Sequence, residues 1–406
     1  MMNILLLSPW LPWPLYDGGR IRIFETLRCM SRRHSVTLVT SVCRPEEVEQ
    51  AAALKEFCPN VVTTVLSNKT AAVVSRLSRG MLSRRPLIQS FYYDAGLARK
   101  IRQLTSRVAY DVIQVEFPFL APYLRAIDPR SRAKKILTMH NIESLRFERE
   151  LQLAHWGKRR LVLLGNHFFF REWEKEALRQ FDGIIAVSEV ERTWVQQQVP
   201  GTAVEMIPNG VDTEYFHAAS PIARASDPYI VFTGAMDYPP NVDAAGWFCN
   251  EILPALQRSV PQIRLKIVGK NPHPHVLALT QRNGVEVTGT VPDIRSYVSG
   301  SLALVVPLRS GGGTRLKILE AMALERPVIS TTVGAEGLDA SSGTEILIAD
   351  DAQQFINHIQ SLLSSPETGA AIGKAGRRLV MEKYDWRVCL GGLDRLYGRL
   401  LGEEAA

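Results

Sequence analysis

Short apolar runs alternate with longer amphipathic segments along most of the chain. The first cycle passes from the apolar run Asn3–Ser8 through a glycine-bearing loop, Pro9–Gly19, and an amphipathic segment, Arg20–Arg33, to a second apolar run, Ser35–Thr40. Continuous apolar runs are typical of strands buried on both faces, and a helical period between them indicates a crossover helix. The pattern therefore predicts a βαβ unit at the start of the chain.

The same alternation occurs on both sides of an aperiodic stretch rich in Ser, Ala and Pro, His217–Pro228. Before this stretch, further strands are predicted at Val112–Val115, Lys135–Met139 and Gly183–Val187, with a clear helical pattern at Phe168–Phe181. After it, strands are predicted at Tyr229–Thr233, Arg264–Val268, Val285–Thr288, Leu302–Val306, Pro327–Thr332 and Glu345–Ile348. Strands alternating with helices indicate α/β architecture with parallel, doubly wound sheets, here one on each side of a linker.

A chain of 406 residues is too long for one ordinary core. We predict a Rossmann-like N-terminal domain over residues 1–212, a second Rossmann-like domain over 213–385, and a last helix within 386–406 that packs back on the first domain. Doubly wound sheets bind ligands outside the carboxyl ends of their strands, so a ligand is expected in a central cleft between the two sheets.

Composition excludes several classes of protein. Hydrophobic residues make up 46% and charged residues 22%, which is typical of a folded globular chain. The five cysteines form no C-x-x-C pair, which argues against a disulfide framework or a cysteine zinc site. The apolar run at the start is too short for a signal peptide, and no segment reaches the length of a spanning helix, so a cytoplasmic location is expected.

Positive charge is concentrated in the first half. Residues 1–200 carry 30 Lys and Arg against 19 Asp and Glu, whereas the remainder carries 18 against 22. A basic half suits nucleic acid, an anionic bilayer or a phosphorylated substrate, although a solvated cationic surface gives the same pattern. Nucleic acid is disfavoured because no helix-turn-helix or ribonucleoprotein motif is present. The basic, apolar stretches Ser78–Pro86 and Gly157–Lys175 suit peripheral contact with the inner face of a membrane, or, for the second, an ordinary buried helix.

A glycine-rich loop follows the predicted strand Leu302–Val306 and leads into a helical pattern. The segment reads GGGTRLKILEAMA, and its candidate binding residues are Gly311, Gly312, Gly313, Thr314, Arg315, Lys317 and Glu320. Glycines allow backbone N–H groups to approach an anion, and the start of a helix carries partial positive charge. Helical spacing places Gly313, Lys317 and Glu320 on one face, where a cation beside a carboxylate suits a phosphate next to a sugar. A surface Lys–Glu pair behind a flexible loop is the alternative.

Three motifs resemble the retaining glycosyltransferases of family 4, which have the two-domain GT-B fold. They are IPNGVD (Ile207–Asp212), LEAMALERPVIST (Leu319–Thr331) and VGAEGL (Val333–Leu338), and the resemblance covers nearly the whole chain. GGGTRLKILEAMA is most similar to a subgroup found in capsule and exopolysaccharide clusters. The resemblance implies that a nucleotide-sugar donor is bound without a metal ion, and no D-x-D motif is present.

The resemblance also implies roles in the second domain. Glu320 is expected to bind the ribose, and Gly312–Arg315 to lie near the diphosphate and donor sugar. Two departures are present: Gly312 stands where most members carry the first glutamate of E-x7-E, and Gly234 lacks the arginine that usually follows it. Arg315 and Lys317 are therefore candidates to supply the missing charge, and the region around Val287 is a candidate contact for the base.

In the first domain, the candidates follow predicted strands. Gly18 and Gly19, in DGGR, resemble the family's glycine loop that faces the donor diphosphate, although tight turns use the same residues. His140 and Asn141 end a strand, and the family places a histidine of this kind against the donor sugar; a structural histidine is the alternative. Glu116 is a candidate contact for the acceptor or a turn cap.

These observations predict a glycosyltransferase that transfers a sugar from a nucleoside diphosphate to a hydroxyl of a glycan or lipid-linked acceptor. His140, Arg315 and Lys317 are the candidate catalytic residues, with no resident cofactor and no metal; His273–His275 is too isolated to suggest one. Positioning and stabilisation of the leaving group are expected to supply most of the rate. A nucleotide-sugar epimerase and a catalytically silent nucleotide-sugar-binding partner protein are the alternative functions.

Overall fold

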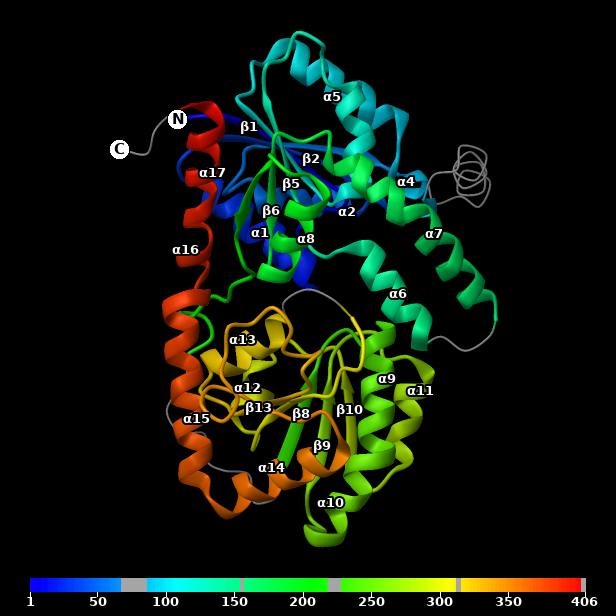
Figure 1. The fold of residues 1–406 in the computed structure, drawn as a ribbon, viewed down its shortest axis with the longest axis vertical. Helices are drawn as coiled ribbons and strands as arrows, with labels where there is room; N and C mark the ends of the chain where they lie inside the picture. Colours follow the sequence, from blue (N-terminus) through cyan, green and yellow to red (C-terminus); the bar gives the residue numbers. More distant parts are fainter. Residues whose placement is uncertain (67–85, 154–156, 218–227, 312–314, 403–406) are drawn as a thin grey trace. The chain divides into compact units, whose positions relative to one another are not determined.

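The computed structural model describes residues 1–66, 86–153, 157–217, 228–311 and 315–402 (Figure 1). The chain folds into two compact units. The first consists of residues 1–208 together with 390–406, and the second of residues 209–389. The predicted linker, His217–Pro228, lies almost wholly outside the described residues, as does the basic stretch Ser78–Pro86.

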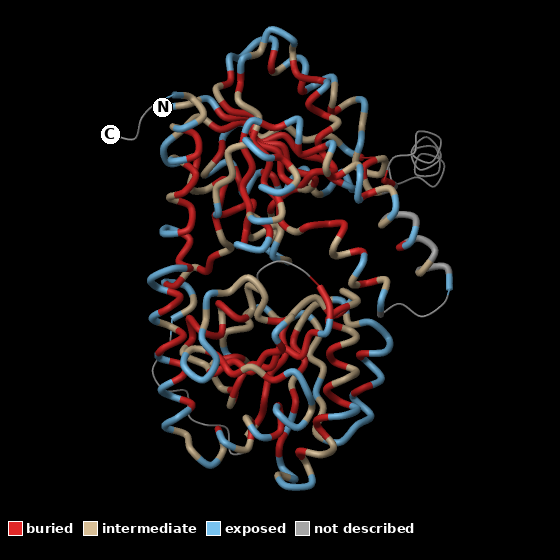
Figure 2. Tube along the Cα trace, in the orientation of Figure 1, coloured by how far each residue is buried: buried red, intermediate tan, exposed pale blue. Residues whose placement is uncertain are grey.

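The first unit is built on a seven-stranded parallel sheet in the order β3-β2-β1-β4-β5-β6-β7. Its strands are β1 (Asn3–Ser8), β2 (Ser35–Val42), β3 (Asn60–Val65), β4 (Val112–Glu116), β5 (Lys134–Thr138), β6 (Gly183–Ala186) and β7 (Ala203–Met206). The central strands are almost completely buried, as the red core of this unit in Figure 2 shows. Burial on both faces explains their continuous apolar sequences.

Helices flank the first sheet. They are α1 (Gly18–Ser31), α2 (Glu47–Gln50), η1 (Ala51–Leu54), α4 (Leu87–Tyr92), α5 (Ala95–Arg107), η2 (Pro118–Ala126), α6 (Glu143–Leu153), α7 (Lys158–Leu178), α8 (Glu189–Gln198) and α17 (Gly391–Leu401). Asp17, Asp94 and Ser188 cap α1, α5 and α8, each accepting a hydrogen bond from a backbone N–H in the first turn. These caps fix where the crossover helices begin.

The second unit repeats the architecture with a six-stranded parallel sheet in the order β10-β9-β8-β11-β12-β13. Its strands are β8 (Tyr229–Thr233), β9 (Arg264–Val268), β10 (Val285–Gly289), β11 (Leu304–Val306), β12 (Val328–Ser330) and β13 (Leu347–Ile348). Its helices are α9 (Pro239–Trp247), η3 (Phe248–Ile252), α10 (Leu253–Ser259), α11 (Pro274–Ala278), η4 (Leu279–Gln281), α12 (Arg295–Ser299), α13 (Leu316–Ala323), α14 (Ala352–Ser364), α15 (Pro366–Leu379), η5 (Val380–Tyr384) and α16 (Trp386–Cys389). Figure 1 shows α15 along one side of this unit and α9 and α11 along the other.

The two doubly wound parallel sheets confirm the predicted fold class. Every strand predicted from an apolar run is present, but β3 and β7 have no counterpart in the prediction. Both are edge strands of the first sheet and are only partly buried. An edge strand is covered incompletely, so its sequence lacks the continuous apolar run that marks a central strand.

The predicted last helix is interrupted. α16 belongs to the second unit and α17 to the first, and Leu390, the residue before α17, separates them. Within the described residues, no helix is both long enough and apolar enough to cross a bilayer.

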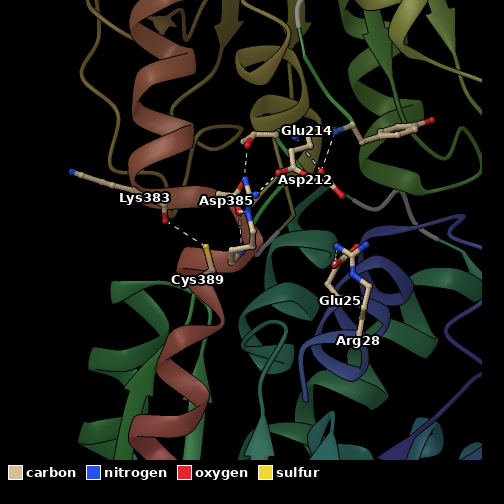
Figure 3. Close-up of polar contacts among 10 residues, drawn as sticks. Glu25, Arg28, Asp212, Glu214, Lys383, Asp385 and Cys389 are labelled. Carbon is tan, nitrogen blue, oxygen red and sulfur yellow. Dashed lines mark hydrogen bonds and ion pairs between the residues drawn. The ribbon is translucent and has the colours of Figure 1, made fainter. Parts of the chain in front are cut away.

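Within the second unit, residues 211–214 near its start contact residues 385–387 near its end (Figure 3). Val211 pairs with Asp385 as an isolated β-bridge, and Asp385 accepts hydrogen bonds from Thr213 and from the guanidinium of Arg387, which also contacts Glu214. Burial acts to raise the pKa of Asp385, but the hydrogen bonds from Arg387 and Thr213 lower it to about 2. Val211, in the motif IPNGVD, takes part in this contact through its bridge to Asp385.

The glycine of IPNGVD has no room for a side chain. A Cβ on Gly210 would lie 2.8 Å from the Trp386 ring and from the Tyr384 carbonyl oxygen. The close approach of these segments therefore requires glycine at this position.

Candidate functional site

Both sheets reverse their strand order next to the predicted binding loops. In the first sheet the reversal lies between β1 and β4, and in the second between β8 and β11. Adjacent loops that leave a sheet at such a point run in opposite directions and open a crevice at the carboxyl edge. In each unit, candidate residues lie at or beyond the carboxyl ends of these strands.

In the second unit, Gly234, Asn241, Lys317 and Glu320 form what we call the α13 cluster. Lys317 and Glu320 lie one turn apart at the start of α13, which begins at Leu316 after the extended residue Arg315. The Lys317 Nζ donates a hydrogen bond to the Asn241 Oδ1 at 3.2 Å and lies 4.4 Å from the centre of the Phe232 ring. The ammonium is thus held at the carboxyl end of β8.

The charges of Lys317 and Glu320 are poorly solvated. Desolvation, helped by the nearby Arg315 and opposed by Glu320, lowers the pKa of Lys317 to about 7. Desolvation also raises the pKa of Glu320 to about 7, against the effect of Lys317. Strongly shifted pKa values of adjacent groups are typical of functional sites, because a charge held without full hydration favours a ligand of opposite charge.

Glycines bring the backbone close to Lys317. A Cβ on Gly234, where φ is +148°, would lie 2.8 Å from both the Asn241 Nδ2 and the Lys317 Nζ. The next strand supports this loop, because a Cβ on Gly269 would lie 1.6 Å from the Gly234 carbonyl oxygen. Gly311 has a φ of +117°, and a Cβ there would lie 2.6 Å from a guanidinium nitrogen of Arg315. Neighbouring side chains at Gly234 and Gly311, and neighbouring backbone at Gly269, occupy the space that a Cβ would need, so glycine is required at all three positions.

The loop after β12 is fastened to the loop after β11. The Thr331 hydroxyl donates to the Leu308 carbonyl at 2.5 Å and accepts from the Gly334 N–H at 2.9 Å. A Cβ on Gly334 would lie 2.4 Å from the Ser330 Oγ and 2.8 Å from the Val306 carbonyl oxygen. The motif VGAEGL therefore closes tightly over the carboxyl ends of β11 and β12.

In the first unit, Gln114, Glu116, Thr138 and His140 form what we call the His140 network. Gln114 and Glu116 alternate along β4, Thr138 is the register partner of Glu116 on β5, and His140 follows two residues later. Alternate residues point to one face of a sheet, which brings all four side chains together. Glu116 accepts hydrogen bonds from Gln114 at 2.9 Å and Thr138 at 3.0 Å, and its other oxygen lies 2.7 Å from the His140 Nε2.

Burial and hydrogen bonding set the charges of the His140 network. Burial lowers the pKa of His140, although Glu116 acts to raise it. Burial acts to raise the pKa of Glu116, but hydrogen bonds from His140 and Gln114 and the charge of Arg22 lower it overall. An ionised Glu116 beside a neutral His140 requires that Nε2 carry the hydrogen, which leaves Nδ1 as an acceptor.

Stacked aromatic rings connect the glycine loop to His140. The Phe117 and His140 rings lie 3.9 Å apart and nearly parallel, and the Trp10 ring packs 5.1 Å from Phe117. A Cβ on Gly19 would approach the Trp10 ring to 3.3 Å and the Phe117 ring to 3.7 Å. Phe117 has a φ of +76°, a strained value for a bulky side chain and one of the features that cluster at functional sites.

The structure brings together several of the predicted residues within each unit. In the first unit, Glu116 contacts His140, and Gly19 packs against Phe117, whose ring stacks on His140. In the second unit, Gly234 and Glu320 lie near Lys317. Glu116 is fully buried, with both carboxylate oxygens used inside the first unit, so its contacts support His140 and not an acceptor or a turn.

The other predicted residues have separate places. Gly18 is the exposed first residue of α1, and Asn141 is a partly exposed neighbour of His140. Val287 lies on β10, at the edge of the second sheet and two strands from β8. Gly312, Gly313 and Thr314 lie outside the described residues.

Sequence reasoning missed residues that hold the predicted ones. Asn241 orients Lys317, Phe117 stacks on His140, and Gln114 holds Glu116. One signal was present for Gln114, since a glutamine inside the apolar strand VIQVE needs a buried partner. Asn241 and Phe117 carry no comparable signal because their partners are distant in sequence.

Two further observations bear on other ligands. Among the residues that the structure describes, no three His, Cys, Asp or Glu side chains gather as a group that could hold a metal ion. A pocket of about 570 Å³ lies outside both clusters, between α4, η2 and α7, where Phe168, Phe169, Arg171 and Trp173 contribute to its lining.

Two family descriptions match consecutive parts of the chain. "Glycosyltransferase Family 4" matches residues 16–215, and "Glycosyl transferases group 1" matches residues 227–365. The first therefore spans most of the first unit and the second most of the second unit.

Individual proteins are similar over much of their length. An uncharacterized 44.6 kDa protein in the cps region of Klebsiella pneumoniae is 22% identical over 402 residues, or 95% of this chain and 97% of that protein. The GDP-mannose-dependent alpha-(1-6)-phosphatidylinositol monomannoside mannosyltransferase of Mycolicibacterium smegmatis is 27% identical over 298 residues, or 63% of this chain and 76% of that enzyme. The solved structure of HepE from Anabaena in complex with UDP-glucose matches with a TM-score of 0.68 and 15% identity, covering 98% of this chain and 100% of that one.

Proposed function

This chain belongs to the family 4, or group 1, glycosyltransferases with the GT-B fold, and from that premise we propose that it is a retaining enzyme that uses a nucleoside-diphosphate sugar. The bond between the sugar C1 and the diphosphate oxygen breaks, and its electron pair leaves on the nucleoside diphosphate. The acceptor hydroxyl oxygen bonds to C1, and its proton passes to the departing diphosphate. Retention follows the resemblance of the motifs. The α13 cluster is the observation that carries this proposal, because it places an underhydrated cation beside a carboxylate at a helix start.

The three polar side chains of the α13 cluster each have a role in this reaction. Lys317 neutralises charge on the diphosphate as it leaves, together with Arg315 and the N-terminus of α13. Glu320 accepts hydrogen bonds from the ribose hydroxyls. Asn241 holds the Lys317 ammonium through its side-chain oxygen. In the first unit, His140 binds substrate through Nδ1, the acceptor nitrogen of its neutral ring.

The acceptor is proposed to be a growing polysaccharide or a lipid-linked glycan. The similarity to a protein of a cps region supports a role in surface polysaccharide synthesis. Guanine and uracil are the candidate donor bases, since one relative is GDP-mannose-dependent and one structural neighbour is in complex with UDP-glucose.

A thermal-shift panel tests the donor site. UDP-, GDP-, ADP- and CMP-linked sugars are each added to the wild type and to Glu320→Ala. We expect one nucleotide class to raise Tm, because a ligand at 100 times its Kd stabilises the folded state by about 2.7 kcal/mol. The shift should be smaller in Glu320→Ala, which lacks the ribose acceptor. Absence of any shift at millimolar concentrations would contradict the proposal.

Product analysis then separates transfer from the alternative functions. Donor and a panel of glycan acceptors are incubated with the protein, and products are followed by mass spectrometry. We expect a glycosylated acceptor and free nucleoside diphosphate. Conversion of the donor sugar without acceptor would indicate an epimerase, and binding without any turnover would indicate a silent partner protein.

Donor binding is expected to weaken as pH rises above about 7. The pKa of Lys317 is about 7 without ligand, and a bound diphosphate favours the ammonium, so binding at higher pH must take up a proton. Affinity should then fall by up to about tenfold per pH unit. Isothermal titration of Glu320→Gln with the nucleotide sugar, from pH 6 to 9, isolates the effect of Lys317. A pH-independent affinity would exclude this coupling, and Lys317→Met serves as the control without a titrating amine.

We further propose peripheral membrane contact through α7, whose Phe168 is 76% exposed and lies beside Arg171. An exposed aromatic ring next to a cation suits the interface of an anionic bilayer. Co-sedimentation with vesicles of phosphatidylglycerol and phosphatidylcholine should show binding that Phe168→Asp reduces several-fold. Val190→Asp, on the exposed surface of α8, is the matched control. Equal sedimentation of both variants and the wild type would refute the contact.

A further inference from the structure

A buried tyrosine near the end of the chain joins the His140 network. Tyr397, on α17, is fully buried and donates its hydroxyl hydrogen to the Gln114 Oε1 at 2.5 Å. The hydroxyl also lies 3.7 Å from the Met30 Sδ. Burial raises the pKa of Tyr397 well above its usual value, so the hydroxyl remains a donor at every pH at which the protein is assayed. Tyr397 and Gln114 are 283 residues apart in sequence, yet both belong to the first unit.

This hydroxyl determines how the Gln114 amide is oriented. A phenol donor in front of one amide atom requires the oxygen there, which directs the Nε2 group to Glu116 at 2.9 Å and to Thr138 at 3.0 Å. In the reverse orientation, the amide oxygen would face the carboxylate of Glu116, and the amide nitrogen would face a donor. Tyr397 and the Glu116 carboxylate therefore favour the same amide orientation, and removal of the hydroxyl weakens that preference.

The orientation of Gln114 in turn determines what Glu116 offers to His140. The Glu116 Oε1 accepts from both Gln114 and Thr138. Burial acts to raise the pKa of Glu116, but the hydrogen bond from Gln114 is among those that lower it and so favours the ionised carboxylate. An ionised Oε2 can only accept from the His140 Nε2. The hydrogen bond made by one ring nitrogen sets which nitrogen carries the hydrogen. Stacking on Phe117 fixes the plane of the ring at the same time.

We propose that Tyr397 is a positioning residue for His140, which it acts on through Gln114 and Glu116 by holding the imidazole in the tautomer that has hydrogen on Nε2. The helix at the end of the chain thereby controls the nitrogen that His140 presents to substrate. This inference rests on the proposed function, in which His140 binds substrate.

The same helix is attached to the first unit at other points that do not involve this chain of hydrogen bonds. Asp394 accepts from Arg33 and contacts the His34 ring, and Arg395 and Arg399 contact Glu205. A variant at Glu205 therefore loosens α17 without removing a member of the chain, and it serves as the matched structural control.

Other charged groups act on His140 from the elements packed around it. Arg22 of α1 acts to lower its pKa, whereas Glu116 of β4 and Glu143 of α6 act to raise it. None of these three is altered in the variants that test Tyr397, so a change in the ring state can be assigned to the hydrogen-bond chain.

The test combines nitrogen NMR of histidine-labelled protein with kinetics of sugar transfer. The chain has 8 histidines, and comparison with His140→Ala identifies the His140 signals. Tyr397→Phe removes only the hydroxyl, Gln114→Leu removes the middle link, and Glu205→Ala is the control. In the wild type, the His140 nitrogen shifts should show hydrogen on Nε2 and a bare Nδ1.

We expect Tyr397→Phe to give a mixture of His140 tautomers and to lower kcat about tenfold, with little change in KM for the donor. The double variant Tyr397→Phe with Gln114→Leu should have the same kcat as Gln114→Leu alone, because both substitutions interrupt the same series of hydrogen bonds. Glu205→Ala should lower Tm but leave the His140 shifts and kcat unchanged.

Three outcomes overturn the inference. They are unchanged His140 shifts in both chain variants, additive losses in the double variant, and a tautomer change in Glu205→Ala equal to that in Tyr397→Phe. Should Tyr397→Phe not fold, Gln114→Leu alone decides by its His140 shifts. A fully active His140→Ala would instead refute the proposed role of His140 in substrate binding. The His140 nitrogen shifts of the wild type, Tyr397→Phe and Gln114→Leu would still test whether Tyr397 controls the tautomer.

Discussion

Replacing Lys317 with methionine is expected to lower kcat/KM for sugar transfer by about 10²–10³-fold, the usual effect of removing one preorganised group that stabilises developing charge. The Lys317 ammonium lies at the start of α13, where the helix terminus also favours negative charge. Initial rates over a range of donor concentrations measure the loss. The loss should be mainly in kcat, because charge on the diphosphate increases as the sugar bond breaks.

Arginine is not expected to replace Lys317. The Nζ atom lies 4.4 Å from the centre of the Phe232 ring and is hydrogen-bonded to Asn241, against the backbone of Gly234. A planar guanidinium is larger than an ammonium and does not fit this space. Lys317→Arg should therefore have less than a tenth of the wild-type activity. If any positive charge at this position were sufficient, Lys317→Arg would instead be nearly as active as the wild type.

The loss of activity in Lys317→Met should not come from unfolding. The folded-state pKa of Lys317, about 7, lies below its usual 10.5, so between these values the unfolded chain binds a proton that the folded chain does not. The free energy of unfolding therefore rises with pH across this window, and below it the charged Lys317 amine destabilises the folded state. Methionine removes that cost, and Tm at pH 6 should equal or exceed that of the wild type.

A cation elsewhere on the same sheet provides the control. Lys266 on β9 pairs with Glu286 at 3.4 Å and lies over the Tyr229 ring. Lys266→Met should keep kcat/KM within about twofold, since an exposed ion pair contributes little. Equal losses in the two variants would show that charge on the second unit matters in general, and would refute a specific role for Lys317.

Gly269→Ala is expected to destabilise the second unit by more than about 3 kcal/mol. The new Cβ would lie 1.6 Å from the Gly234 carbonyl oxygen, far inside contact distance, and φ at this position is +159°. Two adjacent strands of the sheet, β8 and β9, would have to separate where they end. Differential scanning calorimetry should show the transition of this unit lowered by roughly 6–12 °C, or the protein should be recovered unfolded.

Gly246→Ala is the matched control in the same unit. Gly246 lies inside α9, where a Cβ would meet no atom within 4 Å. Alanine is favoured over glycine in a helix by about 0.8–1.0 kcal/mol, so this variant should be as stable as the wild type or more so. A small effect of Gly269→Ala, comparable with that of Gly246→Ala, would show that the β8 and β9 loops are not closely packed.

Much of the fold could be predicted because central parallel strands are buried on both faces. β1, β8 and β9 were located at their full length for this reason. The edge strands β3 and β7 were missed because partial exposure removes the apolar run. The limits of α1 were also misjudged, since Asp17 caps it and Gly18 already belongs to its first turn.

The candidate site could be predicted in part. Lys317 and Glu320 were found because helical spacing places them together locally, and His140 was found because it follows a buried strand. The role of Glu116 was not predicted, since its carboxylate is committed to His140 by the register of β4 and β5. Register between strands depends on packing and is not encoded in local periodicity.

The sequence by itself determined the α/β class, the division into two sheets, the family and the positions of the loops at the strand ends. These follow from local periodicity, glycine content and motifs, each contained within a short segment of chain. The tertiary structure decided three contacts: that of Asn241 with Lys317, that of Gly269 with Gly234, and that of Tyr397 with Gln114. Partners so distant along the chain meet only when helices and strands pack, because their shape and hydrogen-bonding complement each other in space and leave no local pattern in the sequence.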